Sequence, residues 1–427
     1  MKIAIAGYGV EGEANYAYWA KDPANELTIV DEREPSMTPP EGATVLIGSD
    51  KLRALQGYDL VVRTAGLAPY KLATDGKVWS GTNEFFAKCP APIIGVTGSK
   101  GKGTTASLIA SILEAAGKKV WLVGNIGKPA ISVVDQIQPT DIVVYELSSF
   151  QLWDLQASPH VAVVLYIERE HLDVHRSMQE YVEAKAQITR WQGPEDRLVY
   201  NVINEHAQAI AQTSQAHKVP YPSNDAAHIR DDYFYYDGQR VCPTSALQIQ
   251  GAHNLSNAVA SIDAVWEYVQ DPAAIEAGLR AFKGLPHRLA FVRNVNGVDY
   301  YDDSIATTPG SAIAAMRAFK GRPQVLILGG SSKGSDFSSV AAEALQHEVT
   351  VLLIGDEADR IAEALEGAGF TNYERVDGGS MTKLVRRAAE IARPGGVVLL
   401  SPAAASFGLF KNYVDRGEQF ISAVNGL

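Results

Sequence analysis

A glycine-rich stretch between an apolar run and a helix-like segment constrains the fold of this chain more than any other feature. It spans residues 95–105, GVTGSKGKGTT, and follows Pro92 and two isoleucines. Its glycines allow a tight turn whose N–H groups face inward, and the N-terminus of the following helix adds positive potential. Lys102 can then reach a phosphate oxygen. The stretch therefore predicts a strand–loop–helix unit that binds a nucleoside triphosphate.

This stretch departs from the strict G-x-x-x-x-G-K-[ST] pattern at two positions. Val96 occupies the position of the first glycine of the pattern. Gly103 occupies the position of the hydroxyl residue that binds magnesium, so a later threonine would have to supply that hydroxyl. A glycine-rich turn can also be purely structural, and that alternative stays open for the stretch taken alone. The residues expected to hold the nucleotide are Gly98, Ser99, Gly101, Lys102, Gly103, Thr104 and Thr105.

Composition limits the class of protein and its partners. The 427 residues suit about three domains, and 46% apolar residues allow each domain a core. The net charge is 38 − 49 = −11 without a long basic run, which argues against a nucleic-acid or anionic-membrane partner. Cys89 and Cys242 are too few for a disulfide framework or a zinc cluster. No signal peptide or membrane-spanning run is evident, so we expect a cytoplasmic protein.

Three successive series of apolar runs and helix-like segments predict an α/β chain of three domains. Residues 1–90 predict a Rossmann-like domain that ends at a Pro-Ala-Pro linker. Residues 91–284 predict a P-loop ATPase-type domain with a parallel sheet and a hairpin around 233–238 at its edge. Residues 285–427 predict a second Rossmann-like domain. The expected strands are 2–6, 27–30 and 60–62; 93–96, 120–123, 142–145 and 161–166; and 325–328, 349–354 and 397–400.

The amino-terminal domain carries its own glycine turn. Residues 7–12, GYGVEG, open the first predicted helix after a strand. Asp31 ends the next strand, at about the spacing at which a carboxylate meets a ribose hydroxyl. Because the same turn holds any diphosphate, this motif leaves a redox dinucleotide and another nucleotide equally open.

Two polar segments follow predicted strands of the central domain. Glu146 leaves a strand at the carboxyl edge, where one carboxylate and one loop threonine suffice for a magnesium ion bound to triphosphate. A strand-end glutamate paired with a surface lysine is the alternative. The segment 167–175, IEREHLDVH, gathers acid and imidazole groups before Lys185, which suits a second metal. We expect His171 to take part and His175 to be a polar residue satisfied at the surface.

The third domain places further polar residues after its strands. Arg288 and Asp303 lie near the predicted domain junction, Lys333 follows a strand and a glycine turn, and Ser406 and Tyr413 follow the last strand. Such groups bind anions. Each segment alone can be an ordinary loop, but polar sets after several strands in one chain indicate a ligand.

Together these motifs resemble the Mur ligase family, the ATP-dependent amide-forming enzymes of peptidoglycan precursor synthesis, over the whole chain. The segments that carry the resemblance are 98–102, 146–152, 171–173, 251–258 (GAHNLSNA), 286–288, 401–406 and 410–413 (FKNY). Within the family, the SSFQL and FKNY segments are similar to those of the member that adds D-glutamate.

The resemblance implies a role for each candidate residue. Lys102 would hold ATP phosphate, and two magnesium ions would be bound, one by Glu146 and Thr104 and one by His171 and a carbamylated Lys185. Adenine or ribose would contact Asn257, Arg288 and Asp303; uridine and diphosphate would contact Gly9, Val10, Glu11, Gly12 and Asp31; the muramyl group would contact Asn125 and Ser148; and glutamate would contact Lys333, Ser406 and Tyr413.

The resemblance also implies a reaction, the joining of D-glutamate to UDP-N-acetylmuramoyl-L-alanine. The γ-phosphate of ATP would activate the substrate carboxylate as an acyl phosphate, which the glutamate amine would attack. A lysine amine is normally protonated at neutral pH and cannot add CO₂. Carbamylation of Lys185 therefore requires burial or nearby cations to lower its pKa. We expect the enzyme to be a monomer.

Three positions depart from the family pattern. Besides Gly103, Ile305 stands where this ligase commonly has a lysine, which leaves L-glutamate open as a substrate, and residues 63–66, RTAG, replace a Ser-Pro-Gly turn near the uridine end. Three other functions also stay open: a folylpolyglutamate-synthase-like ligase, an NAD-dependent oxidoreductase, and a nucleotide-binding module without catalysis.

Overall fold

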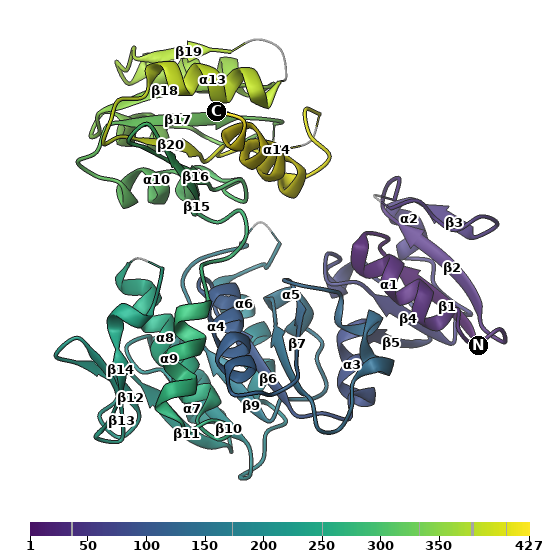
Figure 1. The fold of residues 1–427 in the computed structure, drawn as a ribbon. Helices are drawn as coiled ribbons and strands as arrows, with labels where there is room; N and C mark the ends of the chain where they lie inside the picture. The colour runs from purple at the N-terminus through teal and green to yellow at the C-terminus, as the bar shows by residue number, and fades with distance from the viewer. Residues whose placement is uncertain (36, 173, 250, 333, 377–379, 407) are drawn as a thin grey trace. The chain divides into compact units, whose positions relative to one another are not determined.

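The computed structural model of this protein describes residues 1–35, 37–172, 174–249, 251–332, 334–376, 380–406 and 408–427. These residues form two units, 1–282 and 283–427, both built from largely parallel sheets and helices (Figure 1). The α/β class expected from the sequence is confirmed, whereas the division into three domains stays a prediction. Within the described ranges, no helix has both the length and the apolar character needed to cross a membrane.

The first unit begins with a five-stranded parallel sheet in the order β3-β2-β1-β4-β5. Alternate residues of β1 pack on opposite faces, Ala4 on one side and Ile3 on the other, so both faces are buried as a parallel sheet requires. The strand order reverses beside β1, and open α/β sheets bind ligands outside the carboxyl ends of their strands at such a switch point. The elements are β1 Lys2–Ala6, α1 Val10–Trp19, β2 Glu26–Asp31, β3 Thr44–Ile47, α2 Ser49–Leu52, β4 Leu60–Arg63, η1 Pro69–Lys71, β5 Lys77–Ser80 and α3 Gly81–Lys88.

A six-stranded parallel sheet follows in the order β11-β10-β9-β6-β8-β7. An antiparallel sheet, β12-β13-β14, lies after it and contains the expected hairpin, whose turn at Asp237 and Gly238 has positive φ at both residues. The elements are β6 Ile93–Thr97, α4 Lys102–Ala115, β7 Val120–Gly124, β8 Ile142–Glu146, α5 Ser149–Leu152, β9 Val161–Val164, α6 Met178–Ala186, β10 Arg197–Asn201, α7 Glu205–Thr213, β11 His217–Tyr221, β12 Ala227–Arg230, β13 Tyr233–Tyr236, β14 Gln239–Pro243, α8 Ala252–Val265 and α9 Pro272–Ala281.

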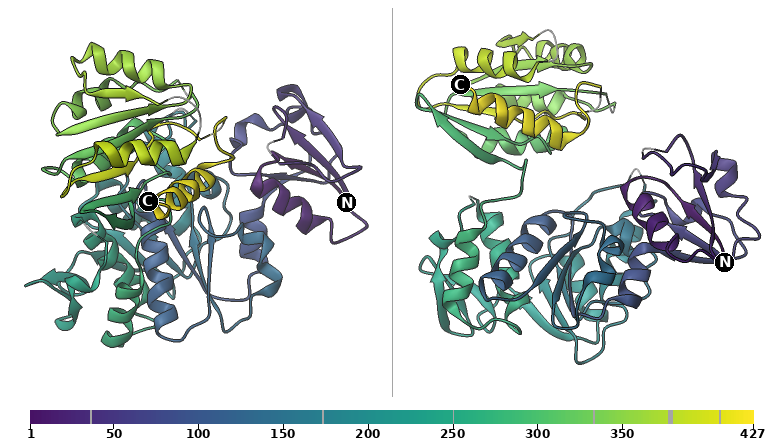
Figure 2. Two further views of the ribbon diagram at one scale, coloured as in Figure 1. Left: turned by 45° about the horizontal axis from the view of Figure 1, so that its top comes forward. Right: turned by 45° about the vertical axis from the view of Figure 1, so that its right-hand side comes forward.

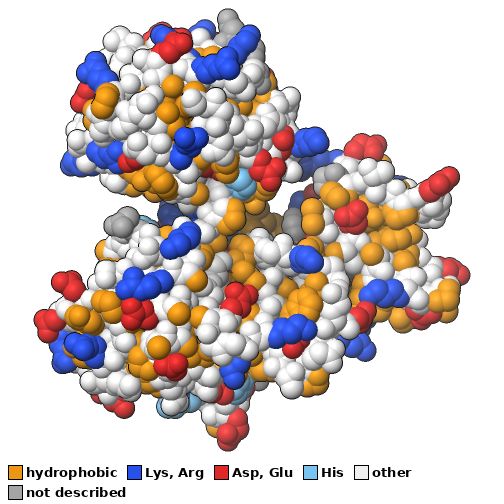
Figure 3. All heavy atoms as spheres, viewed as in Figure 1, with side chains coloured by type: hydrophobic (Ala, Val, Ile, Leu, Met, Phe, Trp, Pro, Cys, Tyr) orange, Lys and Arg blue, Asp and Glu red, His pale blue; other side chains and the backbone are white. Residues whose placement is uncertain are grey.

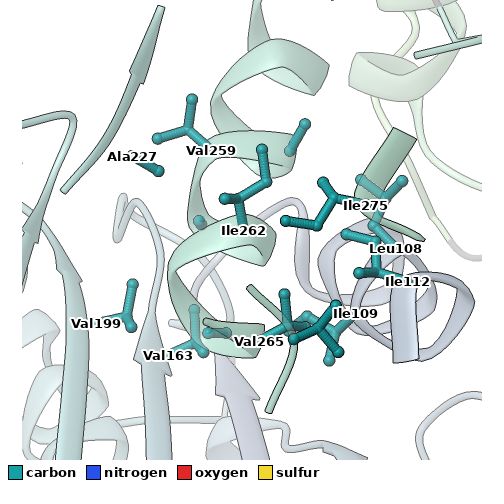
Figure 4. Packing of buried hydrophobic residues seen from close by; sticks show 14 of the residues in the cluster. Leu108, Ile109, Ile112, Val163, Val199, Ala227, Val259, Ile262, Val265 and Ile275 are labelled. Carbon is teal, nitrogen blue, oxygen red and sulfur yellow. The ribbon is translucent and has the colours of Figure 1, made fainter. Parts of the chain in front are cut away.

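The core of this part fixes helix α4. Figure 4 shows Leu108 and Ile112 of α4 near Ile275 of α9, while Val163 and Val199 of the sheet lie across α8 from them in the same core. Burial of each such side chain stabilises the fold by about 1.5–3 kcal/mol. The N-terminus of α4, where the phosphate loop ends, is therefore held firmly against the sheet.

The second unit is a six-stranded sheet in the order β15-β16-β20-β17-β18-β19, parallel except for the β15–β16 hairpin. Successive residues of β17 alternate between two cores, Leu326 with α10, α11 and α12 and Ile327 with α13 and α14, so helices cover both faces (Figure 2). The elements are β15 Ala290–Val295, β16 Val298–Asp302, α10 Pro309–Ala318, β17 Gln324–Gly329, α11 Ser338–Ala344, β18 Val349–Ile354, α12 Ala358–Gly367, β19 Tyr373–Arg375, α13 Met381–Ile391, β20 Val397–Leu400 and α14 Tyr413–Asn425.

Candidate active site

The loop between β6 and α4 has the backbone of a phosphate-binding turn. Gly98 and Gly101 have φ values of 153° and 86°, where side chains are disfavoured. A Cβ atom on Gly98 would lie 2.7 Å from Cβ of Leu165, and one on Gly101 would lie 2.5 Å from Oδ1 of Asn257. The backbone conformation therefore favours glycine at both positions, and at Gly98 Leu165 also leaves no space for a Cβ atom.

Polar contacts hold this loop in place. The Lys102 amine donates hydrogen bonds to the carbonyls of Gly98 at 3.0 Å and Ser99 at 2.7 Å. The Ser99 hydroxyl donates to the carbonyl of Glu168 and accepts from its N–H group, both at 2.9 Å, which ties the loop to the segment after β9. Gly103 and the nearly buried Thr104 and Thr105 form the first turn of α4, and among the described residues Thr105 Oγ1 has no hydrogen-bond partner.

Glu146 and Lys185 lie at the same edge of the sheet. Residue Val96 of β6 pairs with Glu146, which ends β8 and is buried. Lys185, on α6, is 1% exposed, and its amine donates to the carbonyl of Gly98 at 2.7 Å, the same oxygen that Lys102 contacts. Burial lowers the pKa of Lys185 well below its usual value, the Lys102 charge lowers it further, and the carboxylates of Glu170 and Glu146 oppose the shift. Two amines and a buried carboxylate thus surround the loop.

The two histidines of the 167–175 segment have different environments. The ring of His171 is partly exposed, and its Nε2 lies 3.8 Å from a carboxylate oxygen of Glu170. His175 was expected at the surface, but the structure corrects this, because aromatic side chains cover it and leave it 1% exposed. The sequence pattern did not reveal that α5 would supply these aromatic neighbours.

Three further candidates lie around this edge. Asn125, exposed after β7, donates its N–H to the carbonyl of Glu146 at 3.3 Å. The Ser148 hydroxyl caps α5 by accepting from the N–H of Gln151 at 3.2 Å. Asn257, on α8, is buried beside Gly101, and its amide donates to Oδ1 of Asn254 at 3.2 Å. Among the described residues, no three His, Cys, Asp or Glu side chains are close enough to form a metal site on their own.

The glycine turn after β1 is braced by two carboxylates. Asp31 accepts a hydrogen bond from the N–H of Tyr8 at 2.6 Å, and Glu11 accepts one from the N–H of Ala65 at 2.7 Å. Burial raises the pKa of Glu11. Gly9 precedes α1, Val10 is exposed, and a Cβ atom on Gly12 would lie 2.3 Å from the carbonyl oxygen of Gly7. The helix N-terminus therefore opens at the carboxyl edge of the first sheet.

The second unit groups its candidates near the ends of β16 and β20. Asp303 accepts hydrogen bonds from the Ser401 hydroxyl at 2.7 Å and the Leu289 N–H at 3.0 Å, and burial raises the pKa of its carboxyl to about 7. Arg288 is exposed, and its charge opposes that shift. Ser406 is buried and Tyr413 partly exposed at the start of α14. Lys333 lies outside the described residues.

Sequence reasoning missed several buried polar residues. Arg416 is fully buried and donates to the carbonyls of Ser304 and Ala404. Tyr181 places its hydroxyl 2.9 Å from Oγ of Ser99, and Lys185 lies over its ring. The spacing of Tyr181 and Lys185 by four residues is helical and indicated a shared face. No comparable signal marked Arg416.

A cavity and the charged surface complete the description. The cavity, of about 540 Å³, lies at the carboxyl ends of β9 and β10 and is lined in part by Tyr166, Arg169 and Ile203. On the face viewed in Figure 3, positive and negative side chains are interspersed rather than segregated by sign. On this face the described residues therefore form no large patch of a single charge.

Known family domains and named relatives match most of this chain. The Mur ligase middle domain matches residues 96–265, and the domain described as Mur ligase, glutamate ligase domain matches residues 287–404. The UDP-N-acetylmuramoylalanine--D-glutamate ligase of Symbiobacterium thermophilum is 38% identical over 402 residues, which cover 90% of this chain and 88% of the relative. The protein of the same name from Acetivibrio thermocellus is 38% identical over 459 residues, covering 100% and 96%.

Solved structures share the fold. The MurF ligase of Thermotoga maritima, solved in complex with ADP, aligns with a TM-score of 0.59 at 16% identity, covering 99% of this chain and 95% of that one. At this identity the likeness establishes the arrangement of strands and helices alone.

Proposed function

This chain belongs to the Mur ligase family, and from that premise we propose that it joins D-glutamate to UDP-N-acetylmuramoyl-L-alanine with conversion of ATP to ADP. One observation carries the proposal: relatives named for this ligation are 38% identical over nine-tenths or more of the chain. The resemblance noted in the sequence is thereby confirmed at the level of the family. Solved folylpolyglutamate synthases share the fold at 17–19% identity, so the relatives at 38% identity favour the proposed ligation over that alternative. The oxidoreductase alternative rests on the amino-terminal glycine turn alone.

The phosphate loop supports the use of ATP. The left-handed turns at Gly98 and Gly101 and the N-terminus of α4 suit an anion, and Lys102 lies where its amine can exchange the loop carbonyls for phosphate oxygens. Asn257, Arg288 and Asp303 would hold adenine and ribose. Ser99, Gly103 and Thr105 would shape the loop that binds the phosphates.

The residues at this edge also fit magnesium. A magnesium ion bound to triphosphate needs only one or two protein oxygens, and buried Glu146 with Thr104 can supply them. Magnesium would neutralise charge on the phosphoryl oxygens. His171 and a carbamylated Lys185 would hold a second ion, and the lowered pKa of Lys185 supports this role because the neutral amine is the form that adds CO₂.

The proposed reaction has two steps. A carboxylate oxygen of the muramyl substrate attacks the γ-phosphorus, and ADP leaves. The uncharged amine of glutamate then attacks the acyl carbon, the phosphate leaves with one former carboxylate oxygen, and the nitrogen loses a proton. Lys102 would stabilise the negative charge that develops on the transferred phosphoryl group, as fixed positive groups do in phosphoryl transfer.

The remaining candidates would select the substrates. Gly9, Val10, Glu11, Gly12 and Asp31 would bind the uridine diphosphate end, Asn125 and Ser148 the muramyl group, and Lys333, Ser406 and Tyr413 the glutamate. We further propose that the enzyme works as a monomer in the cytoplasm.

The test is phosphate release from ATP with each partner omitted in turn and with both glutamate enantiomers. We expect release only when the muramyl nucleotide and D-glutamate are both present. Lys102→Ala should lower kcat/KM by about a hundredfold or more. Lys100→Ala is the matched control from the same loop, since its side chain is 77% exposed and paired with Glu168, and it should stay within about threefold of wild type.

Two results would count against the proposal. Phosphate release that does not depend on the muramyl nucleotide would reject the substrate. A Lys102→Ala variant with the full rate would reject the site.

A further inference from the structure

The backbone at His171 is held in an unfavourable conformation. Its φ is 56°, in the left-handed region, which is unfavourable for a residue other than glycine. The carbonyl of His171 accepts from the N–H groups of Val174 at 3.2 Å and His175 at 2.9 Å, which closes a tight turn. Such a conformation persists only where surrounding contacts determine it. The contacts of this turn therefore decide the direction of the His171 side chain.

His175 is the buried side chain of the turn that packs against helix α5 and the residue that follows it. Its ring stacks on that of Phe150, with 5.3 Å between centroids and 9° between planes, and lies 4.1 Å from the ring of Trp153. Its Nε2 is 3.0 Å from the hydroxyl of Ser149. Ser149 and Phe150 belong to α5 and Trp153 follows directly, so the buried ring of His175 packs the turn against this helix.

The ring of His171 rests on aromatic side chains that also contact His175. Phe150 lies 4.9 Å from His171, and Tyr181 lies 6.3 Å from His171 and 5.3 Å from His175. The Tyr181 hydroxyl is 2.9 Å from Oγ of Ser99 in the phosphate loop. Ring pairs at such separations attract one another beyond the effect of burial. The two histidines and the phosphate loop therefore share one packed aromatic cluster.

We propose that His175 is a positioning residue that holds His171 in its orientation at the nucleotide site through the packing of its ring. The inference rests on the proposed function only for the role of His171. Truncation of His175 would leave a cavity under the turn and allow the His171 backbone to relax. Phenylalanine at 175 would keep the packing and lose only the hydrogen bond to Ser149.

The direct test follows His171 itself by nuclear magnetic resonance, in the full chain with ¹³C at Cε1 of its histidines. The His171 signal is assigned by its loss in His171→Asn. We expect His175→Ala to shift or broaden this signal and His175→Phe to leave it near its wild-type position. His228→Ala is the matched control, because His228 is also buried and stacks on an aromatic ring, that of Tyr235 at 5.6 Å, but lies on β12. It should leave the signal unchanged.

Kinetics give a second readout. We expect His175→Ala to lower kcat about tenfold or more and to raise the magnesium concentration for half-maximal rate, with KM for ATP changed less than about threefold. His175→Phe should recover a rate within about threefold of wild type. If His175→Ala does not fold, His175→Gln, which also lacks an aromatic ring, takes its place with the same expectations.

The proposal would be overturned if the His171 signal stays at its wild-type position in the folded His175→Ala or His175→Gln variant. It would also be overturned if His175→Phe restores neither the wild-type position of the His171 signal nor the wild-type rate. The same experiments distinguish an error in the proposed function from an error in the positioning role of His175. If His171→Asn keeps the full ligase rate, the role of His171 in catalysis is wrong, whereas a shifted signal still establishes that His175 positions it.

Discussion

Asp263, on α8, is a carboxyl group buried in the core of the first unit. It is 0% exposed, one oxygen accepts from the N–H of Ala227 at 2.8 Å, and among the described residues the other oxygen has no hydrogen-bond partner. Burial raises its pKa well above the usual value, and the hydrogen bond and the charge of Arg197 only partly oppose this. The protonated form is therefore the one that the fold favours.

The raised pKa of Asp263 predicts a loss of stability with rising pH. Between the unfolded and folded pKa values the native state binds the extra proton, so the free energy of unfolding falls by roughly 1.4 kcal/mol per pH unit from this group. We expect Asp263→Asn to remove this slope and to gain relative to wild type as pH increases. Urea unfolding across about pH 5 to 8 measures it, with the exposed Asp225→Asn as control. Parallel wild-type and Asp263→Asn profiles would contradict the prediction.

Among single residues, the sequence predicts the position of those whose place in the pattern of strands and helices determines their neighbours. Lys102 follows β6 and Glu146 ends β8, two strands that pair side by side, and the alternation of strand and helix predicts that both residues lie at one edge of the sheet. The burial of His175 and Arg416 depends on segments distant in the chain, Phe150 and Trp153 for one and residues 304 and 404 for the other. One sequence carries no local signal for such contacts.

At the scale of elements, the phosphate-loop helix α4 packs closely against α9 at a glycine. A Cβ atom on Gly278 would lie 2.4 Å from Cα and 2.8 Å from N of Ile112, both backbone atoms that cannot turn aside. Helix propensity favours alanine by about 1 kcal/mol, but overpacking costs about 1–3 kcal/mol or more. The net effect of an alanine at this position is therefore expected to be destabilising. The two helices would have to separate to accept a methyl group.

We expect Gly278→Ala to lower the free energy of unfolding by about 1–2 kcal/mol. All six tryptophans lie in the first unit, at positions up to 266, so fluorescence during urea unfolding of the full chain reports this unit. Gly193→Ala is the control, since no atom lies within 4 Å of its Cβ position and its φ is not left-handed. Equal stability of the two variants would show that the helices adapt freely.

The predictability of elements follows their burial. The long apolar run of β18, VTVLLI, was evident, whereas the four-residue, partly exposed strands β3 (TVLI) and β5 (KVWS) were missed, although β3 does contain a short apolar run. The β15–β16 hairpin did carry a signal that was not used, an Asn-Gly turn at 296–297, where φ is 52° and 82°. Short edge strands depend on pairing with neighbours, which periodicity does not encode.

At the scale of the molecule, ion pairs of two kinds join the two parallel sheets of the first unit. Arg63, which ends β4, is 1% exposed and donates to the carboxylate oxygens of Asp154 at 2.6 and 2.7 Å and to the carbonyl of Phe150 at 2.9 Å. Lys21 and Asp135 join the same parts at 2.5 Å, but both side chains are more than half exposed. Charge pairs in water contribute little, whereas a buried charge left without its partner is costly.

For the buried pair, we therefore expect the loss in the free energy of unfolding to be larger when one partner is replaced than when both are replaced. Asp154→Asn should lower the free energy of unfolding by about 3 kcal/mol, because the buried guanidinium of Arg63 loses the carboxylate to which it is directly bonded. The double variant Arg63→Met with Asp154→Leu should recover most of this loss, since neither member of the pair is then left buried without the other. Lys21→Met should cost less than about 1 kcal/mol. Tryptophan fluorescence in urea measures all three, and a double variant no more stable than Asp154→Asn would mean that Arg63 stabilises the fold mainly through its bonds to backbone carbonyls.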